Sequence, residues 1–292
     1  MIALERAMGE TTMVDVAILG CGYVGMAVAR HWREQGLRIA ATTTRPERLA
    51  ELESIADRAL VMRGSDLAAF SDLLAGGVHT LLICLAAGRQ GDYCATYLAT
   101  AQTLMHYLED YQLEDRPGLG QIIFTSTCSV YGDYGGAWVT EADPPRPLSP
   151  NGTIMLTTEQ TLLTAATDRR QVAILRLGGI YGPGRELATI YRSFAGTVRP
   201  GRGDQPTNWV HLKDIVGAIA FVRQQSLGGI YNLVQDEIPS RRGLVDRVCR
   251  AYNLAAVSWD PTQLETSAYH GRISNQKLKG AGYGFQQPTF LL

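Results

Sequence analysis

The sequence predicts a doubly wound α/β fold, in which a mostly parallel sheet carries helices on both faces. Short runs rich in Val, Ile and Leu alternate with longer segments of helical apolar spacing, from Val14 to about Arg176. This alternation is typical of repeated strand–helix–strand units with buried parallel strands. A second observation is the glycine loop GCGYVG at 20–25, which directly follows the first strand-like run and opens the first helix-like segment.

The elements can be predicted in chain order from these periodicities. Strands are expected at 14–19, 37–43, 58–62, 78–85, 119–126 and 171–177. Helices are expected between them at 23–35, 46–56, 92–110 and 155–168. After Gly178 the pattern loosens into loops at 178–185 and 199–209, helices at 212–225 and 240–252, and a strand at 230–234. The Pro-rich stretch 143–150 is expected to be a loop within the domain.

Composition excludes several classes of function. The chain has 292 residues and a net charge of −1, so it lacks the basic excess of a protein that binds nucleic acid or a membrane surface. No apolar run reaches the roughly 18 residues that a membrane helix needs. Its five cysteines form no CxxC pair, and an odd number cannot all pair in disulfides within the chain. This favours a reducing compartment, and we expect a cytoplasmic protein. The expected partner is a small molecule.

The glycine loop predicts a dinucleotide site. Gly20, Gly22 and Gly25 have the spacing G-x-G-x-x-G, with Tyr23 and Val24 between the last two. Glycines at these positions let the backbone turn tightly and approach a pyrophosphate, whose charge then lies at a helix N-terminus. The alternative is a tight turn with a purely structural role. We predict cofactor binding because strand, loop and helix occur in the required order.

The end of the second strand indicates which cofactor is bound. An Asp or Glu about 20 residues after the loop would bind the ribose 2′-hydroxyl of NAD. Here the strand instead ends in Thr42, Thr43 and Thr44, followed by Arg45. Hydroxyl and guanidinium groups suit a 2′-phosphate, so NADP is favoured over NAD. The alternative is that Arg45 only faces solvent at the start of the next helix.

These features give a domain prediction. Residues 1–13 form an N-terminal extension, 14–178 the dinucleotide-binding domain, and 179–292 a smaller substrate-binding lobe interleaved with it.

Several separate stretches resemble the extended and atypical branches of the short-chain dehydrogenase/reductase superfamily, which include nucleotide-sugar epimerases and dehydratases. The similar stretches are GCGYVG (20–25), GSDL (64–67), CLAAG (84–88), FTSTCSVYGD (124–133), SPNGTIMLTTEQ (149–160), LRLGGIYGPGR (175–185), NWVHLKD (208–214) and RISNQKLKGAGY (272–283). The resemblance implies a Rossmann-type doubly wound sheet and a nicotinamide cofactor.

By this resemblance, Asp66 would contact the adenine, and Leu85, Ala86 and Ala87 would line the diphosphate and ribose. Leu177 and Gly178 would lie near the nicotinamide, and Arg89 falls where such epimerases often carry a lysine that contacts the cofactor. Each apolar member could equally be a packing residue at a strand end.

The family's proton-transfer pair is missing. Its members use a Tyr as general acid or base and a Lys four residues later that lowers the tyrosine pKa. Here Asn151 stands at the Tyr position and Met155 at the Lys position, and residues 140–170 contain neither Tyr nor Lys. An amide cannot exchange a proton near neutral pH, and a thioether cannot lower a neighbour's pKa. The family's usual mechanism therefore cannot operate unchanged.

Other groups near the expected nicotinamide position are candidate catalytic residues. Thr127 stands where the family has its substrate-orienting Ser or Thr, although hydroxyls at a strand end also satisfy backbone groups. Tyr131 is the candidate proton donor, with Tyr134 and Tyr181 as further phenols, and its alternative role is packing of the VYG turn. Arg89 and Arg185 are the cations expected nearby.

The remaining candidates concern substrate and packing. Arg89, Arg185 and Arg202, with Arg192 and Arg199, suit a phosphate or carboxylate of the substrate, unless they form only a solvated basic loop. Cys84 and Cys128 are expected to be packing residues and His211 to be structural. The spacing of His, Cys, Asp and Glu predicts no metal site, and no G-x-S-x-G elbow occurs.

Three hypotheses follow. The first is an NADP-dependent oxidoreductase or epimerase/dehydratase-like enzyme in which Thr127 orients the substrate and Tyr131 or an ordered water supplies the proton. The second is a non-catalytic NADP-binding sensor or assembly factor. The third is hydride transfer to an activated substrate that needs little acid catalysis. A homodimer through 92–110 and 155–168 is expected from their apolar stripes (Leu98, Leu104, Leu108, Leu156, Leu163), although these leucines could equally dock the helices on their own sheet.

Overall fold

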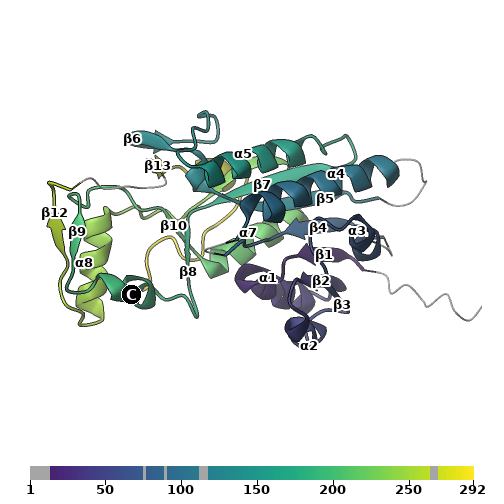
Figure 1. The fold of residues 1–292 in the computed structure, drawn as a ribbon, viewed down its shortest axis with the longest axis horizontal. Helices are drawn as coiled ribbons and strands as arrows, with labels where there is room; N and C mark the ends of the chain where they lie inside the picture. Colours follow the sequence, from purple (N-terminus) through teal and green to yellow (C-terminus); the bar gives the residue numbers. More distant parts are fainter. Residues whose placement is uncertain (1–13, 75–76, 89–90, 112–117, 264–268) are drawn as a thin grey trace, which may run out of the picture. The chain divides into compact units, whose positions relative to one another are not determined.

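The structure is a computed structural model that describes residues 14–74, 77–88, 91–111, 118–263 and 269–292 (Figure 1). The expected extension 1–13 and Arg89 therefore lie outside the described residues. The chain forms two compact units. The first runs to Thr125 and takes in Thr157–Ala173 and Val222–Gly229, and the second comprises Ser126–Leu156, Ile174–Phe221 and Ile230–Leu292.

A central sheet confirms the predicted doubly wound fold. Among the described residues it has seven strands in the order β3-β2-β1-β4-β5-β7-β11. This is the order of dinucleotide-binding sheets, in which the direction of winding reverses between β1 and β4. The strands are β1 (Val16–Leu19), β2 (Ile39–Thr43), β3 (Arg58–Val61), β4 (Thr80–Ile83), β5 (Gln121–Thr127), β7 (Gln171–Leu177) and β11 (Gly229–Leu233). Each lies within two residues of its predicted bounds.

Strand β1 lies at the centre of the sheet, with a parallel neighbour on each side. β1 pairs in parallel with β2 and β4, with Val16 opposite Ile39 on one side and Thr80 on the other. All four residues of β1 are buried, as expected for a central parallel strand. The carboxyl ends of β1 and β2 therefore lie side by side, which places the glycine loop beside Thr43.

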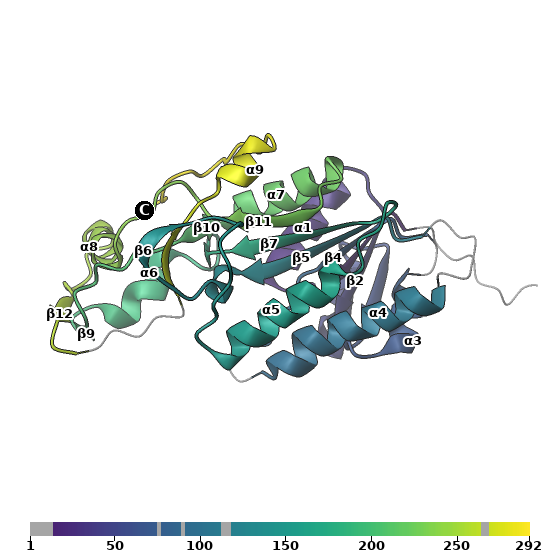
Figure 2. The same cartoon turned by 90° about the horizontal axis from the view of Figure 1, so that it is seen from above.

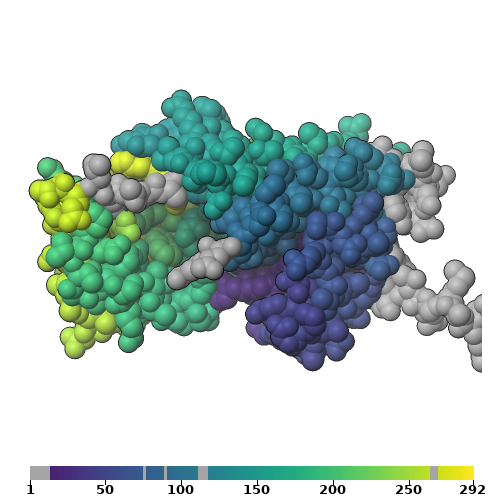
Figure 3. Space-filling model, viewed as in Figure 1, coloured from purple at the N-terminus to yellow at the C-terminus, as the bar shows by residue number. Residues whose placement is uncertain are grey.

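Helices of the first unit cover this sheet. They are α1 (Tyr23–Glu34), α2 (Leu49–Glu53), α3 (Leu67–Leu74) and α4 (Ala99–Tyr111), and Figure 2 shows α3 and α4 running close together. A 3₁₀ turn at Pro46–Arg48 precedes α2, and a π-helical turn at Cys94–Leu98 precedes α4. On the face seen in Figure 3, the blue segments of α3 and α4 form a continuous surface. Helix α3 was not predicted, because its eight residues span little more than two turns.

Helix α5 (Pro150–Leu163) begins five residues before its predicted start. Proline is favoured in the first turn of a helix, where its missing N–H costs no hydrogen bond. The Ser149 hydroxyl accepts the Gly152 N–H at 3.1 Å and so satisfies one free donor of that turn. Only residues 143–149 of the expected Pro-rich loop are therefore outside the helix.

The second unit holds shorter elements. They are β6 (Asp133–Val139), β8 (Gly179–Tyr181), α6 (Leu187–Tyr191), β9 (Val198–Pro200), β10 (Trp209–His211), α7 (Leu212–Gln224), α8 (Arg241–Ala251), β12 (Ser258–Asp260), β13 (His270–Ile273) and α9 (Gln276–Gly280). The predictions of α7, α8 and β11 are confirmed. The predicted loops at 178–185 and 199–209 contain β8, the end of β9 and the start of β10, because strands of three residues are too short to show an alternating pattern.

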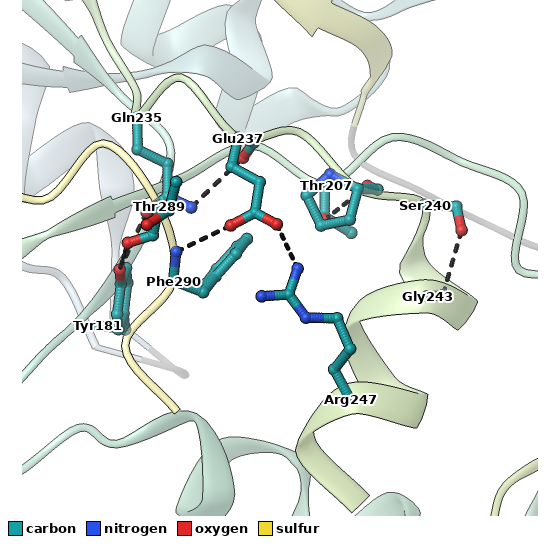
Figure 4. Close-up of polar contacts among 10 residues, drawn as sticks. Tyr181, Thr207, Gln235, Glu237, Ser240, Gly243, Arg247, Thr289 and Phe290 are labelled. Carbon is teal, nitrogen blue, oxygen red and sulfur yellow. Dashed lines mark hydrogen bonds and ion pairs between the residues drawn. The ribbon is translucent and has the colours of Figure 1, made fainter. Parts of the chain in front are cut away.

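Two carboxylates hold the C-terminal segment of the second unit. Asp214, fully buried at the start of α7, accepts the backbone N–H groups of Gln286 and Gln287 at 2.6 and 3.0 Å. Figure 4 shows the Glu237 carboxylate between the Arg247 guanidinium and the Phe290 backbone N–H, which it accepts at 2.9 Å. These charged acceptors fix a segment that has few regular backbone hydrogen bonds of its own.

No helix in the described part of the chain is both long and apolar enough to cross a membrane.

We predict that Asp214→Ala lowers the free energy of unfolding by about 3 kcal/mol, because it leaves the partly buried N–H groups of Gln286 and Gln287 without their acceptor. Asp214→Asn keeps one acceptor oxygen and should lose less. Urea unfolding measures both, and Asp168→Ala on an exposed turn is the control. Equal stability of Asp214→Ala and the control would contradict this role.

Candidate dinucleotide-binding site

The three glycines of the loop have three different roles. Gly20 has φ +94°, and a Cβ there would lie 2.6 Å from the Cys84 carbonyl oxygen, so only glycine fits this turn. A Cβ on Gly25 would lie 2.6 Å from the Gly20 carbonyl oxygen, so this glycine allows the helix to pack closely on the loop. At Gly22, by contrast, a Cβ would meet no protein atom within 4 Å.

Open space at Gly22 is the observation that decides the nature of the loop. Packing within the protein does not require glycine there, whereas close approach of a pyrophosphate does. Gly22 is also the N-cap of α1 and brings no capping side chain, so the first turn of the helix is left for an external acceptor. The residues present therefore fit the diphosphate of a dinucleotide.

Buried polar contacts fix the loop to β2. The Thr42 hydroxyl accepts the Gly20 N–H at 2.9 Å, and the Thr42 carbonyl accepts the Cys21 N–H at 2.8 Å. Thr42 is 1% exposed, so this hydroxyl faces the loop and not a ligand. Sequence reasoning grouped Thr42 with the cofactor-selecting residues, but the structure gives it a bracing role.

Positive charge gathers after β2. Thr43 accepts the Arg45 N–H at 3.1 Å through its hydroxyl, and Arg45 is exposed. Arg48 donates from Nη1 to the Cys21 carbonyl at 2.9 Å and from Nε to Glu51 at 2.8 Å. Arg48 is not predicted from the sequence, because an arginine three residues beyond a predicted site carries no signal of its own.

The other predicted cofactor contacts lie at strand ends of the same unit. Asp66 is exposed and caps α3, where one carboxylate oxygen accepts the Ala69 N–H at 3.1 Å and the other is left for a ligand. Tyr97, in the π-helical turn, accepts the Ala87 N–H at 3.3 Å and donates to the Leu85 carbonyl at 3.4 Å. The segment 85–87 that follows β4 is thus held by a buried phenol.

Two thiols lie in this site, and neither is activated. Burial raises the pKa of Cys21 to about 12, with Cys84 adding to the effect, and burial raises the pKa of Cys84 to about 11. The thiolate is the reactive form, so both groups are unreactive at neutral pH. This supports the expected packing role of Cys84.

In the second unit, Thr127 is engaged locally. Its hydroxyl accepts the Ser129 N–H at 3.2 Å and donates to the Ser129 hydroxyl at 3.1 Å, which caps the 3₁₀ turn after β5. This contact makes Thr127 a structural cap. The hydroxyl can still accept a second hydrogen bond, so the role of orienting a substrate stays open.

The positions of the missing proton-transfer pair differ in environment. Asn151 is exposed in the first turn of α5, whereas Met155 is 3% exposed one turn later. A buried thioether fills the position where the family carries its lysine. An apolar side chain therefore occupies the place where the family's cation would lie.

Tyr131 is poorly suited to the proton-donating role proposed from the sequence. It is fully buried, its hydroxyl donates to the Asn232 side-chain oxygen at 2.7 Å, and the Arg176 guanidinium lies 4.7 Å from its ring centre. Burial raises the pKa of Tyr131 above its ordinary value, although the positive charge of Arg176 acts in the opposite direction. Its position favours the alternative role, packing of the VYG turn.

The other phenols are similarly committed. Tyr181 donates to Gln235 at 3.0 Å, as drawn in Figure 4, and burial raises its pKa to about 12. Tyr134 donates to the Pro144 carbonyl beneath the Arg146 guanidinium.

Leu177 ends strand β7, and Gly178 follows it. Leu177 is 5% exposed, and a Cβ on Gly178 would lie 2.6 Å from the Asn208 carbonyl oxygen, so packing alone explains this glycine. His211 is 4% exposed and burial lowers its pKa, which agrees with a structural role. The Cys128 thiol donates to the Arg176 carbonyl at 3.3 Å.

Arg185 and Arg202 are both exposed in loops of the second unit. Among the described residues, no three His, Cys, Asp or Glu side chains group together as ligands for a metal ion.

Comparison with known proteins gives the family. The model of the NAD dependent epimerase/dehydratase family matches residues 16–233, most of the chain. The chain belongs to this family. Protein YeeZ of Escherichia coli strain K12 is 34% identical over 293 residues, which cover 96% of this chain and 98% of YeeZ. The resemblance to extended short-chain dehydrogenases/reductases is confirmed.

Solved structures share the fold. A functionally unknown conserved protein from Silicibacter pomeroyi DSS has a TM-score of 0.75 and 23% identity, with 95% of each chain covered. UDP-glucose 4-epimerase of Thermus thermophilus, solved with NAD, has a TM-score of 0.71 and 21% identity, with 93% of this chain and 95% of the epimerase covered.

We predict that Gly22→Ala leaves the melting temperature nearly unchanged but weakens dinucleotide binding at least roughly tenfold, because the new methyl occupies the space of the diphosphate. Gly25→Ala should instead lower the melting temperature, because its Cβ collides with the loop carbonyl. Differential scanning fluorimetry and calorimetric titration separate the two effects. Unchanged binding by a folded Gly22→Ala variant would contradict the assignment.

We also predict that iodoacetamide modifies Cys94, which is exposed, before Cys84 at pH 7.5. The alkylation rate of Cys84 should rise about tenfold per pH unit up to a pH of about 11, because its raised pKa leaves little thiolate below that pH. Peptide mass spectrometry measures both rates. A plateau for Cys84 near pH 8 would show that its pKa is not raised.

Proposed function

We propose that this protein binds NADP in preference to NAD and catalyses an oxidoreductase or epimerase/dehydratase-like reaction on a small anionic substrate. The observation that carries the proposal is the glycine loop with its open position at Gly22, next to a strand that ends in Thr43 and Arg45 without a carboxylate. Such a carboxylate would bind a free 2′-hydroxyl and repel a 2′-phosphate. Arg45, whose guanidinium has no acceptor among the described residues, offers the phosphate a charged donor.

The cofactor, when bound, supplies hydride chemistry. The chain's own contribution would be to hold a substrate oxygen by the Thr127 hydroxyl. Because Tyr131 is buried and engaged, an ordered water is the better proton source. A substrate activated enough to need little acid catalysis fits the same arrangement.

An anionic substrate is supported by arginines of the second unit. The guanidinium carbons of Arg199 and Arg241 lie 4.1 and 5.5 Å from the centre of the same Phe194 ring. Two guanidinium groups at one ring bring positive charge together, which suits a phosphate or carboxylate. Arg202, in the loop after β9, and Arg185, in the loop after β8, are exposed and add positive charge to the same unit.

A second candidate function is a non-catalytic NADP sensor or assembly factor. It is favoured by Met155, since a buried methionine at the lysine position leaves no route to the family's proton transfer. The restoring variant Asn151→Tyr with Met155→Lys tests it. Hydride transfer by that variant alone supports the sensor, whereas turnover by the unmodified protein excludes it.

We further propose a cytoplasmic location, supported by five cysteines that are all free thiols. The proposed homodimer would use α4 and α5. Leu104 and Leu108 dock α4 on its own unit, with exposures of 0% and 4%, which leaves the half-buried Leu98, Leu156 and Leu163 for a partner helix.

The cofactor proposal predicts that Arg45→Ala weakens NADPH binding about tenfold or more and leaves NADH binding unchanged, because only NADPH loses a charge-assisted hydrogen bond. Calorimetric titration with each cofactor measures this, and Arg169→Ala, an exposed arginine of the same unit, is the control. Tighter binding of NADH than of NADPH by the unmodified protein would refute NADP preference.

Catalysis is tested in two assays. NADPH oxidation is followed with aldehydes, ketones and imines, and product formation is followed with nucleotide sugars and NADP⁺, because epimerisation and dehydration regenerate the cofactor. We expect turnover with an anionic member and none with its neutral analogue. A protein that binds NADPH but turns over no substrate of any class in either assay would exclude the enzyme and leave the sensor.

A further inference from the structure

Arg48 is the most firmly held cation near the glycine loop. Its Nη1 donates to the Cys21 carbonyl at 2.9 Å and its Nε to the Glu51 carboxylate at 2.8 Å. The side chain is 18% exposed, compared with 48% for that of Glu51. Two fixed contacts set the plane of the guanidinium group, so it is oriented before any ligand arrives.

Arg48 is part of a group of positive charges. The pKa of Glu51 is held below its usual range by its hydrogen bond with Arg48, and the charges of Arg48, Arg30 and Arg45 add to this effect. Three guanidinium groups thus surround one carboxylate, and the group keeps a net positive charge. Within the described part of the chain, no acceptor hydrogen-bonds to Nη2 of Arg48, so its two N–H groups are available to a ligand.

The position of this group relates it to the adenosine end of a dinucleotide. The loop binds the diphosphate, and the adenosine ribose of a cofactor in a doubly wound sheet lies between that loop and the end of the second strand. Arg48 bridges these two places directly, because it follows β2 in the chain and contacts Cys21 inside the loop. A phosphate on the ribose 2′-oxygen would therefore approach its free N–H groups.

We propose that Arg48 is a specificity-determining residue that binds the 2′-phosphate of NADP, while Glu51 and the Cys21 carbonyl hold its guanidinium in place. This inference rests on the proposed NADP preference and adds a second phosphate donor to Arg45. Arg48 acts differently from Arg45, because Arg48 is braced against the loop, whereas Arg45 is exposed and must be ordered by the ligand.

A purely structural role makes a different prediction. If Arg48 only braced the loop, its loss would disturb the diphosphate site and weaken NADPH and NADH binding equally. If it binds the 2′-phosphate, the loss falls on NADPH. The ratio of the two dissociation constants separates these roles without any assay of turnover.

The experiment measures dissociation constants of NADPH and NADH, and of adenosine 2′,5′-bisphosphate and adenosine 5′-monophosphate, for the unmodified protein and for Arg48→Met. Methionine keeps the aliphatic packing and removes the charge and the donors. We expect affinity for NADPH and the bisphosphate to fall about tenfold or more, and affinity for NADH and the monophosphate to change less than about threefold. Arg169→Met is the matched control and should change none of them.

An equal loss for all four ligands, or an unchanged preference in Arg48→Met, would overturn the assignment of Arg48 alone. Tighter binding of NADH than of NADPH by the unmodified protein would instead overturn the proposed NADP preference on which it rests. If Arg48→Met does not fold, Arg48→Gln gives the same comparison, because it also removes the positive charge and keeps a polar side chain at this position. In that variant, an NADPH preference over NADH that falls about tenfold or more supports the proposal, and an unchanged preference overturns it.

Discussion

The shape of the glycine loop is the constraint on which the site depends. Gly20 turns the chain with a positive φ that other residues rarely adopt, and the Thr42 hydroxyl holds its N–H. Because Gly25 then packs against the Gly20 carbonyl, helix α1 starts at a fixed place and points its first turn at the open space beside Gly22. The contacts of Arg48 with Cys21 and of Tyr97 with the 85–87 segment build on this frame. Substitutions that change the frame therefore affect all of the adenosine and diphosphate contacts together.

The two units differ in how much of the family's chemistry they retain. The first keeps the glycine loop, whose open position at Gly22 fits the diphosphate of a dinucleotide. The second replaces the proton-transfer pair by exposed Asn151 and buried Met155, and its central phenol, Tyr131, is buried beside Arg176 with its hydroxyl given to Asn232. Cofactor binding and proton transfer are thus physically separable in this chain. The proposed reaction would therefore draw its proton from an ordered water or use a substrate that is already polarised.

Sequence reasoning predicted the sheet well because its strands are buried on both faces, so apolar runs mark them clearly. It missed β6, β8, β9, β10, β12 and β13, which form two-stranded pairs with partners distant in sequence, and four of which have only three residues. It also placed the start of α5 too late, since Ser149 and Pro150 were interpreted as loop residues although both favour a helix start. Among site residues, spacing identified Gly20, Gly22 and Gly25, but nothing in the sequence shows that Thr42 braces the loop, that Tyr131 is buried, or that Arg48 reaches Cys21. Those facts depend on tertiary contacts.

The central claim is that the first unit binds NADP through the loop and the arginines that follow β2. A crystal structure of the protein with NADP⁺ tests it most directly. We predict that the diphosphate lies at the first turn of α1, beside Gly22. The 2′-phosphate should lie within hydrogen-bond distance, about 3 Å, of Arg45 and Arg48. A cofactor bound elsewhere, or a 2′-phosphate directed into solvent away from both guanidinium groups, would contradict it.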